Sequence, residues 1–253
     1  MDVKKNFVLP IVFHRITKSQ KIRFFDDLRK DDFDSIIETI SEKTVRVNGA
    51  SFETIPGKLN YLITFDDGYS SDFTLAWPTL QKHNIQAISF VVPGKVGKTG
   101  FVSKGQLKQM VGTNMIIGSH SMTHRNLLGL NYKDALEELT SSKKWLEDLT
   151  SAPINFFSFP FGKFNTGLCE MAFEAGYKKV FISQHGIVNP NQKKVNRNSI
   201  NSSMGWRRIQ NTLECKPQTR FSWVVEDNLK AGLKRVLGDS AYRTVRNFLS
   251  KKT

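Results

Sequence analysis

The sequence predicts an α/β fold, a barrel of parallel strands surrounded by helices, and three observations support this. Short apolar runs alternate with helical segments along the chain, as in a parallel sheet with outer helices. Four of these runs end next to residues that can do chemistry, and barrel enzymes carry their sites at the carboxyl ends of their strands. A length of 253 residues also fits one such domain. The four runs lead into His14, into Asp66-Asp67-Gly68, through Ser119 into His120 and His124, and into Pro160-Phe161-Gly162.

The individual elements follow in chain order. Apolar runs predict strands at 8–13, 61–65, 87–92, 115–118, 156–159 and 179–182. Helical spacing predicts helices at about 31–42, 72–83, 105–110, 131–149 and 168–175. Ser103 is a favoured residue type for capping the third helix, and Pro78 must lie near the start of the second or kink it. The polar stretch 189–217 predicts a long loop with one short strand or turn at Trp206–Ile209.

The last 26 residues form a separate region of the sequence. Residues 228–253 place apolar side chains at helical spacing, with seven Lys or Arg against the single acid Asp239, and Gly238 divides them into two helices. These helices either pack on the barrel, as most amphipathic helices do, or lie on an anionic membrane surface. We therefore expect a barrel over residues 1–225 and a basic helical extension over 226–253, in the same domain or at a membrane.

Composition narrows the class of protein. With 39% hydrophobic and 24% charged residues the chain is typical of a globular domain, and no apolar run approaches the roughly 20 residues of a membrane span. The interrupted N-terminal run and two cysteines outside any CxxC pair lead us to expect a cytoplasmic protein. The net charge of +14 allows an anionic lipid, a phosphorylated substrate or simply a solvated surface. No nucleic-acid-binding motif accompanies it, so no nucleic-acid partner is expected.

Asp66-Asp67-Gly68 is the central motif. Adjacent carboxylates at a strand end point to different sides, so one can bind a metal while the other handles protons. Gly68 permits the tight turn that follows. The tripeptide is common in solvated turns. Here it follows a buried run, which favours a functional interpretation.

His120 and His124 are the second motif. The HxxxH spacing places two imidazoles on one face of a helix, or around one point of a loop. Together with one carboxylate, two imidazoles form a metal-ligand set that leaves positions open for water and substrate. Isolated HxxxH pairs are often structural. Three of the five histidines of this chain, however, follow predicted strands.

Three motifs together resemble those of the polysaccharide deacetylases, the NodB-homology or carbohydrate esterase family 4 group. Thr64–Tyr69 is similar to the first motif of the family, His120-Ser-Met-Thr-His124 to its H-[ST]-x-x-H motif, and Phe159–Gly162 to the core of its third. Order and spacing match over about residues 8–185. The resemblance implies a distorted (β/α) barrel of the NodB type that removes the N-acetyl group from an acetylated amino sugar.

The resemblance also implies residue roles. Asp67, His120 and His124 would bind one divalent metal ion, zinc in the first instance, with Co²⁺, Ni²⁺ or Mn²⁺ as alternatives. Asp66 would be the general base. The turn Pro160-Phe161-Gly162 would place a backbone N–H at the oxyanion, so Phe161 in place of the family's usual Tyr keeps that function.

The general acid departs from the usual family pattern. Most members have a late histidine, but no histidine follows residue 185 here. His14 instead ends the first strand in Val-Phe-His14-Arg-Ile, which resembles the Tyr-His-x-Ile element of the circularly permuted members. We assign His14 as the general acid. The alternative is a histidine that only ends a barrel strand.

Two further departures concern the support of the site. The family's third motif carries Arg two positions before its Pro, where this chain has Ser158. That Arg orients the base, and we expect Arg207 or Arg208 to replace it. The fourth motif, which helps form the acetyl pocket, is not recognisable, and Trp206 is the candidate for its role.

The leading hypothesis is a metal-dependent amino-sugar deacetylase that acts on a glycan or glycan precursor during cell-surface glycan assembly. A lipid-linked substrate at the inner membrane face would account for two expectations: an N-terminal run that does not act as an export signal, and basic C-terminal helices. The alternative is a catalytically inactive carbohydrate-binding member of the same fold. A phosphoesterase or nucleic-acid binder rests on charge alone.

Overall fold

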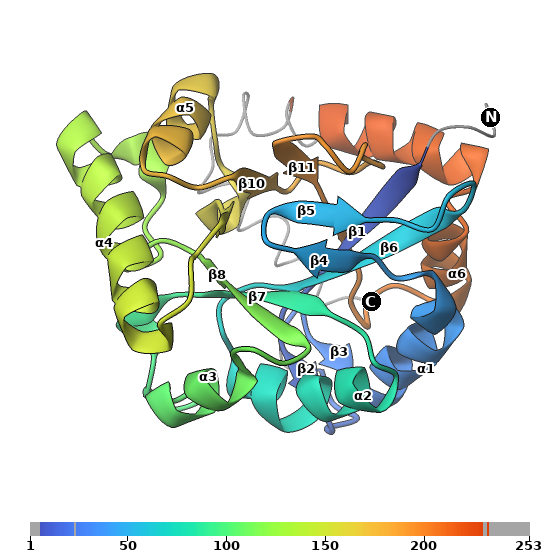
Figure 1. Cartoon of the computed structure of the whole chain (residues 1–253). Helices are drawn as coiled ribbons and strands as arrows, with labels where there is room; N and C mark the ends of the chain where they lie inside the picture. Colours follow the sequence, from blue (N-terminus) through green and yellow to red (C-terminus); the bar gives the residue numbers. More distant parts are fainter. Residues whose placement is uncertain (1–5, 23, 230–231, 233–253) are drawn as a thin grey trace.

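The computed structural model describes residues 6–22, 24–229 and 232, and its centre is one parallel sheet that curls into a nearly closed barrel (Figure 1). The strand order is β11-β10-β9-β8-β7-β6-β1-β12, and all pairs within this sheet are parallel. The predicted barrel is thereby confirmed. Its strands are β1 (Phe7–Phe13), β6 (Leu59–Phe65), β7 (Ala87–Val91), β8 (Met115–Ser119), β9 (Phe156–Ser158), β10 (Lys179–Ile182), β11 (Lys194–Asn196) and β12 (Asn198–Ser199).

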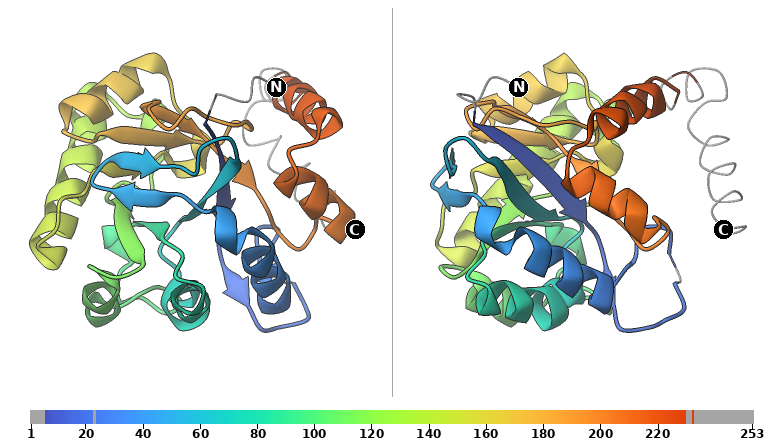
Figure 2. Two further views of the ribbon diagram at one scale, coloured as in Figure 1. Left: turned by 45° about the vertical axis from the view of Figure 1, so that its right-hand side comes forward. Right: turned by 90° about the vertical axis from the view of Figure 1, so that its right-hand side faces the viewer.

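Helices surround this sheet, as both views of Figure 2 show. They are α1 (Lys30–Ile40), α2 (Trp77–Lys82), α3 (Lys104–Met110), α4 (Tyr132–Thr150), α5 (Thr166–Glu174) and α6 (Trp206–Leu213), and residues 217–229 are also helical. Short turns of helix are η1 (Ser41–Lys43), η2 (Asp72–Ala76), η3 (Pro93–Lys95), η4 (Leu127–Gly129) and η5 (Pro160–Gly162). None of the helices within the described ranges is both long and apolar enough to span a bilayer.

Two small sheets lie at the two ends of the barrel. The parallel pair β2 (Ile16–Thr17) and β3 (Leu28–Arg29) follows β1. The antiparallel hairpin of β4 (Arg46–Asn48) and β5 (Ser51–Glu53) crosses the opposite end, in front of the barrel in Figure 1. Phe52 of this hairpin packs on Phe156 and Phe181, with ring centroids 6.0 and 6.4 Å apart, and so covers the barrel interior.

The strands divide their side chains between two cores. In β1, Val8 belongs to a small cluster with Phe90 and Phe181, whereas Leu9 belongs to a larger cluster that includes residues of the outer helices. The alternation follows from the two-residue period of a strand, which turns successive side chains to opposite faces. Both faces are therefore buried, which explains why these strands appear in the sequence as continuous apolar runs.

Pairing of β1 with β6 is in register from Phe7 with Leu59 to Phe13 with Phe65. The two strands end together, and the backbone N–H of Asp66 donates to the Phe13 carbonyl at 3.0 Å. His14 and Asp66 are therefore neighbours because of strand register, as the sequence analysis expected from strand ends that share one face.

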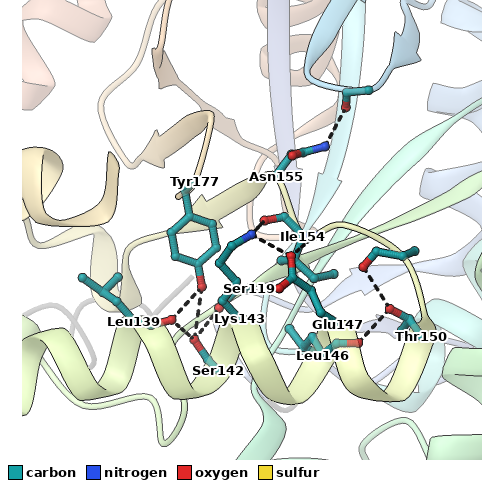
Figure 3. Close-up of polar contacts among 12 residues, drawn as sticks. Ser119, Leu139, Ser142, Lys143, Leu146, Glu147, Thr150, Ile154, Asn155 and Tyr177 are labelled. Atoms are coloured by element: carbon teal, nitrogen blue, oxygen red, sulfur yellow. Dashed lines mark hydrogen bonds and ion pairs between the residues drawn. The ribbon is translucent and has the colours of Figure 1, made fainter. Parts of the chain in front are cut away.

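Polar contacts fix α4 to the strands that lead into the site (Figure 3). Ser142 and Ser119, the last residue of β8, have hydroxyl oxygens 2.8 Å apart. The Tyr177 hydroxyl donates to the Leu139 carbonyl at 2.9 Å, and the Lys143 amine donates to the Ile154 carbonyl at 2.6 Å. These bonds, two of them buried, hold α4 in one place relative to the end of β8, where the histidine motif begins.

Two local predictions were wrong. Residues 189–217 contain β11, β12 and α6 rather than a long loop, and the short strand or turn predicted at Trp206–Ile209 is the start of α6. Ile209 and Leu213 are buried at a spacing of four, so a single amphipathic turn was enough to form this helix. The helices predicted in residues 228–253 lie almost entirely outside the described residues.

Two other local features agree with the sequence. Ser103 caps α3, accepting from the Gln106 N–H, while the Gln106 side chain accepts from the Ser103 N–H in a complete capping box. Pro78 lies in the first turn of α2, directly after the wider π-helical turn of η2.

Asp72 in η2 is the basis of a stability prediction. Its carboxyl group is fully buried and accepts from the Ser89 hydroxyl at 2.7 Å. Burial raises the pKa of Asp72 well above its ordinary value, so the folded protein holds it as the neutral acid. An unfolded chain ionises this group above about pH 4, which stabilises the unfolded state as the pH rises.

We therefore expect Asp72→Asn, which cannot ionise, to be more stable than the wild type at pH 8 and to lose that advantage near pH 4. Thermal melts of both proteins across this range measure the difference. A gap that does not change with pH would show that Asp72 is charged in the folded protein.

Candidate active site

The carboxyl ends of the strands bring together the chemical residues that the sequence singled out. Asp66 and Asp67 follow β6, His14 follows β1, and His120 follows β8. Asp66, Asp67 and His120 are all buried, with at most 8% of each residue exposed.

Asp67, His120 and His124 form a group suited to a metal ion. Each offers one ligand atom, and these three atoms lie within 4.8 Å of one another. His124 Nε2 is 3.2 Å from Asp67 Oδ1, and the two imidazole rings are 4.9 Å apart. His120 Nδ1 is 2.8 Å from the Ser158 carbonyl, which makes Nδ1 the donor and leaves Nε2 as the lone-pair nitrogen. One carboxylate and two imidazoles are a recognised donor set for a divalent metal with open positions.

Proton states agree with ligation. Burial lowers the pKa of His120, and burial together with His120 lowers the pKa of His124 to about 4, so both rings are neutral at pH 7. For Asp67, burial would raise the pKa, but His120, His124 and Lys95 outweigh it and the pKa lies below its ordinary value. Neutral imidazoles and an ionised carboxylate are the forms that bind metal.

Lys95 is a further cation at the group that the sequence did not indicate. Its amine, on η3, lies 2.7 Å from Asp67 Oδ1 and 5.1 Å from the centroid of the Phe101 ring. Phe101 in turn stacks on Tyr69 at 5.1 Å. These three side chains form one wall beside the carboxylate.

The histidine motif forms a loop rather than a helix, and α4 and η3 hold it. Glu138 of α4 accepts from the Thr123 backbone N–H at 2.8 Å and from its hydroxyl. The Gly94 N–H donates to the Met122 carbonyl at 2.9 Å. A β-carbon on Gly94 would lie only 2.8 Å from that oxygen, so the close approach requires glycine.

Left-handed backbone is concentrated at this site. Asp67, Ser121, His124 and Phe161 have φ of 75°, 62°, 64° and 59°, although none of them is glycine. Such residues cost of the order of 1–3 kcal/mol each and persist only where the surrounding structure imposes them. The bonds of Glu138 and Gly94 described above supply that constraint for the histidine loop.

Arg197 is the residue that the sequence analysis missed. It joins β11 to β12, the two strands at opposite ends of the sheet order, and its side chain is fully buried. Its guanidinium donates to both carboxylate oxygens of Asp66, at 2.7 and 2.8 Å, and to the Ser158 hydroxyl at 2.7 Å. Ser158 stands where the family motif has Arg, and its small side chain leaves room for Arg197. This arginine comes from the barrel seam, the junction of β11 and β12.

The expectation for Arg207 and Arg208 is therefore corrected. Arg208 is exposed and pairs with Glu226 at 2.5 Å, because α6 turns it toward residues 217–229. Both arginines line a cavity of about 560 Å³ beside that helix. The only apolar residues that flank Arg197 are Val195 and Ile200, five positions apart in an Asn-rich stretch, and this signal is too weak to predict a barrel strand.

Asp66 is held as a carboxylate by its neighbours. Burial would raise its pKa, but the charge and hydrogen bonds of Arg197, with His120 and His14, outweigh burial and hold the pKa of Asp66 below its ordinary value. His14 thus lies close enough to influence Asp66, as its position beside the end of β6 requires.

The turn Pro160-Phe161-Gly162 lies against the histidines. The Phe161 ring packs edge-on against His124 at 4.6 Å. A β-carbon on Gly162 would lie 2.3 Å from Ser183 Cβ, so the turn sits tightly on the chain after β10. Trp206, at the start of α6, is 40% exposed.

The two remaining histidines lie outside the donor group. His185 Nδ1 lies 2.8 Å from Asp227, and its ring stacks on Trp223 at 5.9 Å. His83 directly follows α2, at the amino end of the barrel strands. Neither belongs to the donor group.

Fold and site together define a barrel hydrolase with an Asp-Asp-His-His centre. The family model for polysaccharide deacetylases matches residues 55–180. YxkH of Bacillus subtilis strain 168 is 26% identical over 200 residues, which is 76% of this chain and 70% of that protein. The poly-beta-1,6-N-acetyl-D-glucosamine N-deacetylase of Staphylococcus aureus MRSA252 is 24% identical over 223 residues, with 76% and 77% covered.

Solved structures show the same fold. Deacetylase PplD of Streptococcus pyogenes, in complex with acetate, superposes with a TM-score of 0.73 at 20% identity, covering 82% of this chain and 98% of that one. IcaB from Ammonifex degensii gives 0.67 at 20% identity, with 79% and 94% covered. The chain belongs to the polysaccharide deacetylase family, as its motifs suggested, and is an enzyme of the polysaccharide N-deacetylase class.

The contact between Arg197 and Asp66 gives a prediction. Arg197→Met leaves a buried carboxylate without its cation, which we expect to cost about 3–5 kcal/mol of stability. It also removes a cause of the low pKa of Asp66, so the acid limb of the pH–rate profile should move to higher pH. Arg197→Lys, which keeps the charge but not the two-pronged contact, should move it less.

The measurement is kcat/KM against pH at equal metal content. Melting curves of each variant show how much of the loss is structural. An Arg197→Met enzyme with the wild-type acid limb would show that Arg197 only fills the seam.

Proposed function

We propose that the protein is a divalent-metal-dependent hydrolase that removes N-acetyl groups from an amino sugar in a glycan or glycan precursor. The observation that carries this proposal is the convergence of Asp67, His120 and His124 beside a second carboxylate, Asp66, that binds Arg197. The family and the named activity of the S. aureus relative support an acetylated glycan as substrate. Zinc is the first candidate for the ion, with cobalt, nickel or manganese as alternatives.

Asp67, His120 and His124 would hold the ion. When bound, it polarises the acetamide carbonyl and acidifies the attacking water. Asp66 takes the proton from that water, and Arg197 keeps its carboxylate ionised and fixed in direction. The backbone N–H of Phe161, in the turn against His124, stabilises the oxyanion. His14, on the neighbouring strand end, donates the proton to the leaving amine.

The substrate is proposed to be lipid-linked. The basic helices predicted for residues 228–253 would then contact an anionic membrane and place the protein at its inner face. Trp206 is proposed to contribute to the acetyl pocket. The inactive carbohydrate-binding alternative is weaker, because a binding domain needs neither a metal group nor a buried base held by arginine.

The proton-transfer role of Asp66 can be tested directly. We expect Asp66→Asn to retain the metal and to lose acetate release from N-acetylglucosamine oligomers by a factor of about 10² to 10⁴, the usual range for a lost general base. Asp67→Asn should instead lower the metal content. Acetate assays and metal analysis of the same preparations give both results. Full activity in Asp66→Asn would reject the assignment, and a wild type that binds no divalent ion would reject the hydrolase.

His14 is tested by His14→Ala. Loss of the acid should reduce kcat by about 10² to 10⁴ at unchanged metal content, because the amine then leaves without a positioned proton donor. His83→Ala, at the far end of the barrel, is the matched control and should keep wild-type activity. Near-wild-type kcat in His14→Ala would leave His14 as a strand-end residue only.

A further inference from the structure

Exposed large apolar side chains gather on one end of the barrel. Apart from residues 217–229, all those in the described chain belong to loops that follow barrel strands, or to the first residue of the helix after such a loop. We define the apolar rim as Phe24, Phe25, Leu128, Tyr132, Phe161 and Trp206, which are 58%, 40%, 44%, 64%, 49% and 40% exposed. In the loops at the opposite end, no large apolar residue among those described is exposed. A surface of this kind, on one face only, marks an interaction site.

The rim lies at the same end of the barrel as the metal group. Phe161 packs against the ligand His124, Leu128 and Tyr132 follow the histidine motif, and Phe24 lies in the loop after His14. Trp206 follows a segment that contacts this loop, since the Ser202 N–H donates to the Asp27 carbonyl at 3.0 Å. The interaction surface and the catalytic face are therefore the same.

The exposed charge of the loops on this face is mostly positive. The loops 14–27, 66–71, 92–103, 120–131, 159–165, 183–187 and 200–205 contain only four carboxylates, Asp26, Asp27, Asp66 and Asp67. Three of these are buried, and Asp26 is half-buried. Among the described residues of these loops, the exposed charges are cations: Lys18, Lys21, Lys98 and Arg125. Asp31, in the first turn of α1, is an exposed acid at the same end. At the opposite end, exposed acids such as Glu42, Glu53 and Glu214 accompany the cations.

We propose that this face docks on an anionic lipid bilayer, with the apolar rim in the interface and the four exposed cations at the headgroups. Trp, Tyr and Phe are the side chains that membrane interfaces favour, and lysine and arginine add attraction to anionic lipid. A neutral glycan can stack on the aromatic side chains of the rim, but it would not explain the exposed aliphatic Leu128 beside loops whose exposed charges are cations. The use of this contact, to bring a lipid-linked acetylated sugar to the metal group, rests on the proposed function. The contact itself does not.

Sedimentation of the full-length protein with vesicles tests the proposal. We compare phosphatidylcholine vesicles with vesicles that also contain phosphatidylglycerol, at low salt. The wild type should bind the anionic vesicles far more tightly. Lys18→Glu with Lys21→Glu should weaken that binding by roughly 25-fold or more, at about fivefold for each lysine lost. Lys82→Glu with Lys108→Glu changes net charge equally at the opposite end, and should have less than about a twofold effect.

The apolar contribution to vesicle binding is tested with a second pair of double variants. Phe24→Ser with Leu128→Ser should weaken anionic-vesicle binding by about tenfold or more, because both side chains lose contact with the interface. Phe221→Ser with Val225→Ser removes apolar groups that are 72% and 48% exposed on residues 217–229, and should leave binding nearly unchanged. Only variants with wild-type melting curves are compared.

Three results would overturn the proposal. The first is no binding of the wild type to anionic vesicles. The second is equal loss in the rim and control variants, which would assign binding to the C-terminal region or to net charge. The third is a wild-type dimer, seen by light scattering, that the rim variants disrupt, which would assign the rim to a second copy of the chain. Binding is measured without turnover and should persist in Asp66→Asn, so failure of the deacetylase hypothesis would be seen separately.

Discussion

The buried ion pair of Arg197 and Asp66 is the interaction on which the site depends. Arg197 lies where the chain passes between the two ends of the sheet, so its side chain ties the barrel seam to the end of β6. The same contact orients the carboxylate that precedes the ligand Asp67. Because both partners are shielded from water, neither could lose the other without leaving a buried charge unpaired. The same contact thus bears on both the barrel seam and the ionised state of the base.

The remaining site residues are held by backbone constraints rather than by charge. Left-handed φ at Asp67, Ser121, His124 and Phe161 occurs directly after the ends of three strands, β6, β8 and β9. These conformations need support, which comes from Glu138 at the histidine loop and from the close fit of Gly94 against Met122. The packing of α4 against β8 therefore contributes to ligand geometry although it lies outside the site.

The sequence predicted those parts that local pattern determines. Continuous apolar runs predicted six of the eight strands, because a strand that is buried on both faces is apolar at nearly every position of its sequence. The strand-end motifs identified Asp66, Asp67, His120 and His124 as neighbours for the same reason. The strands β11 and β12 were missed because they are only three and two residues long and contain few apolar side chains. They form because they complete the barrel, and Arg197 between them was missed for the same reason. A tertiary requirement of that kind leaves no periodic signal.

The way in which Arg197 replaces a motif residue also bears on whether the chain is catalytic. A buried ion pair gives little net stability, and apolar residues of similar volume can serve the same space equally well. Had the barrel been kept only as a binding scaffold, nothing in the packing would require a guanidinium at Ser158 and Asp66. The chain instead directs a buried guanidinium at the one carboxylate whose ionisation the proposed chemistry needs. A charged contact at this place is what a requirement on the ionisation of Asp66 itself would produce.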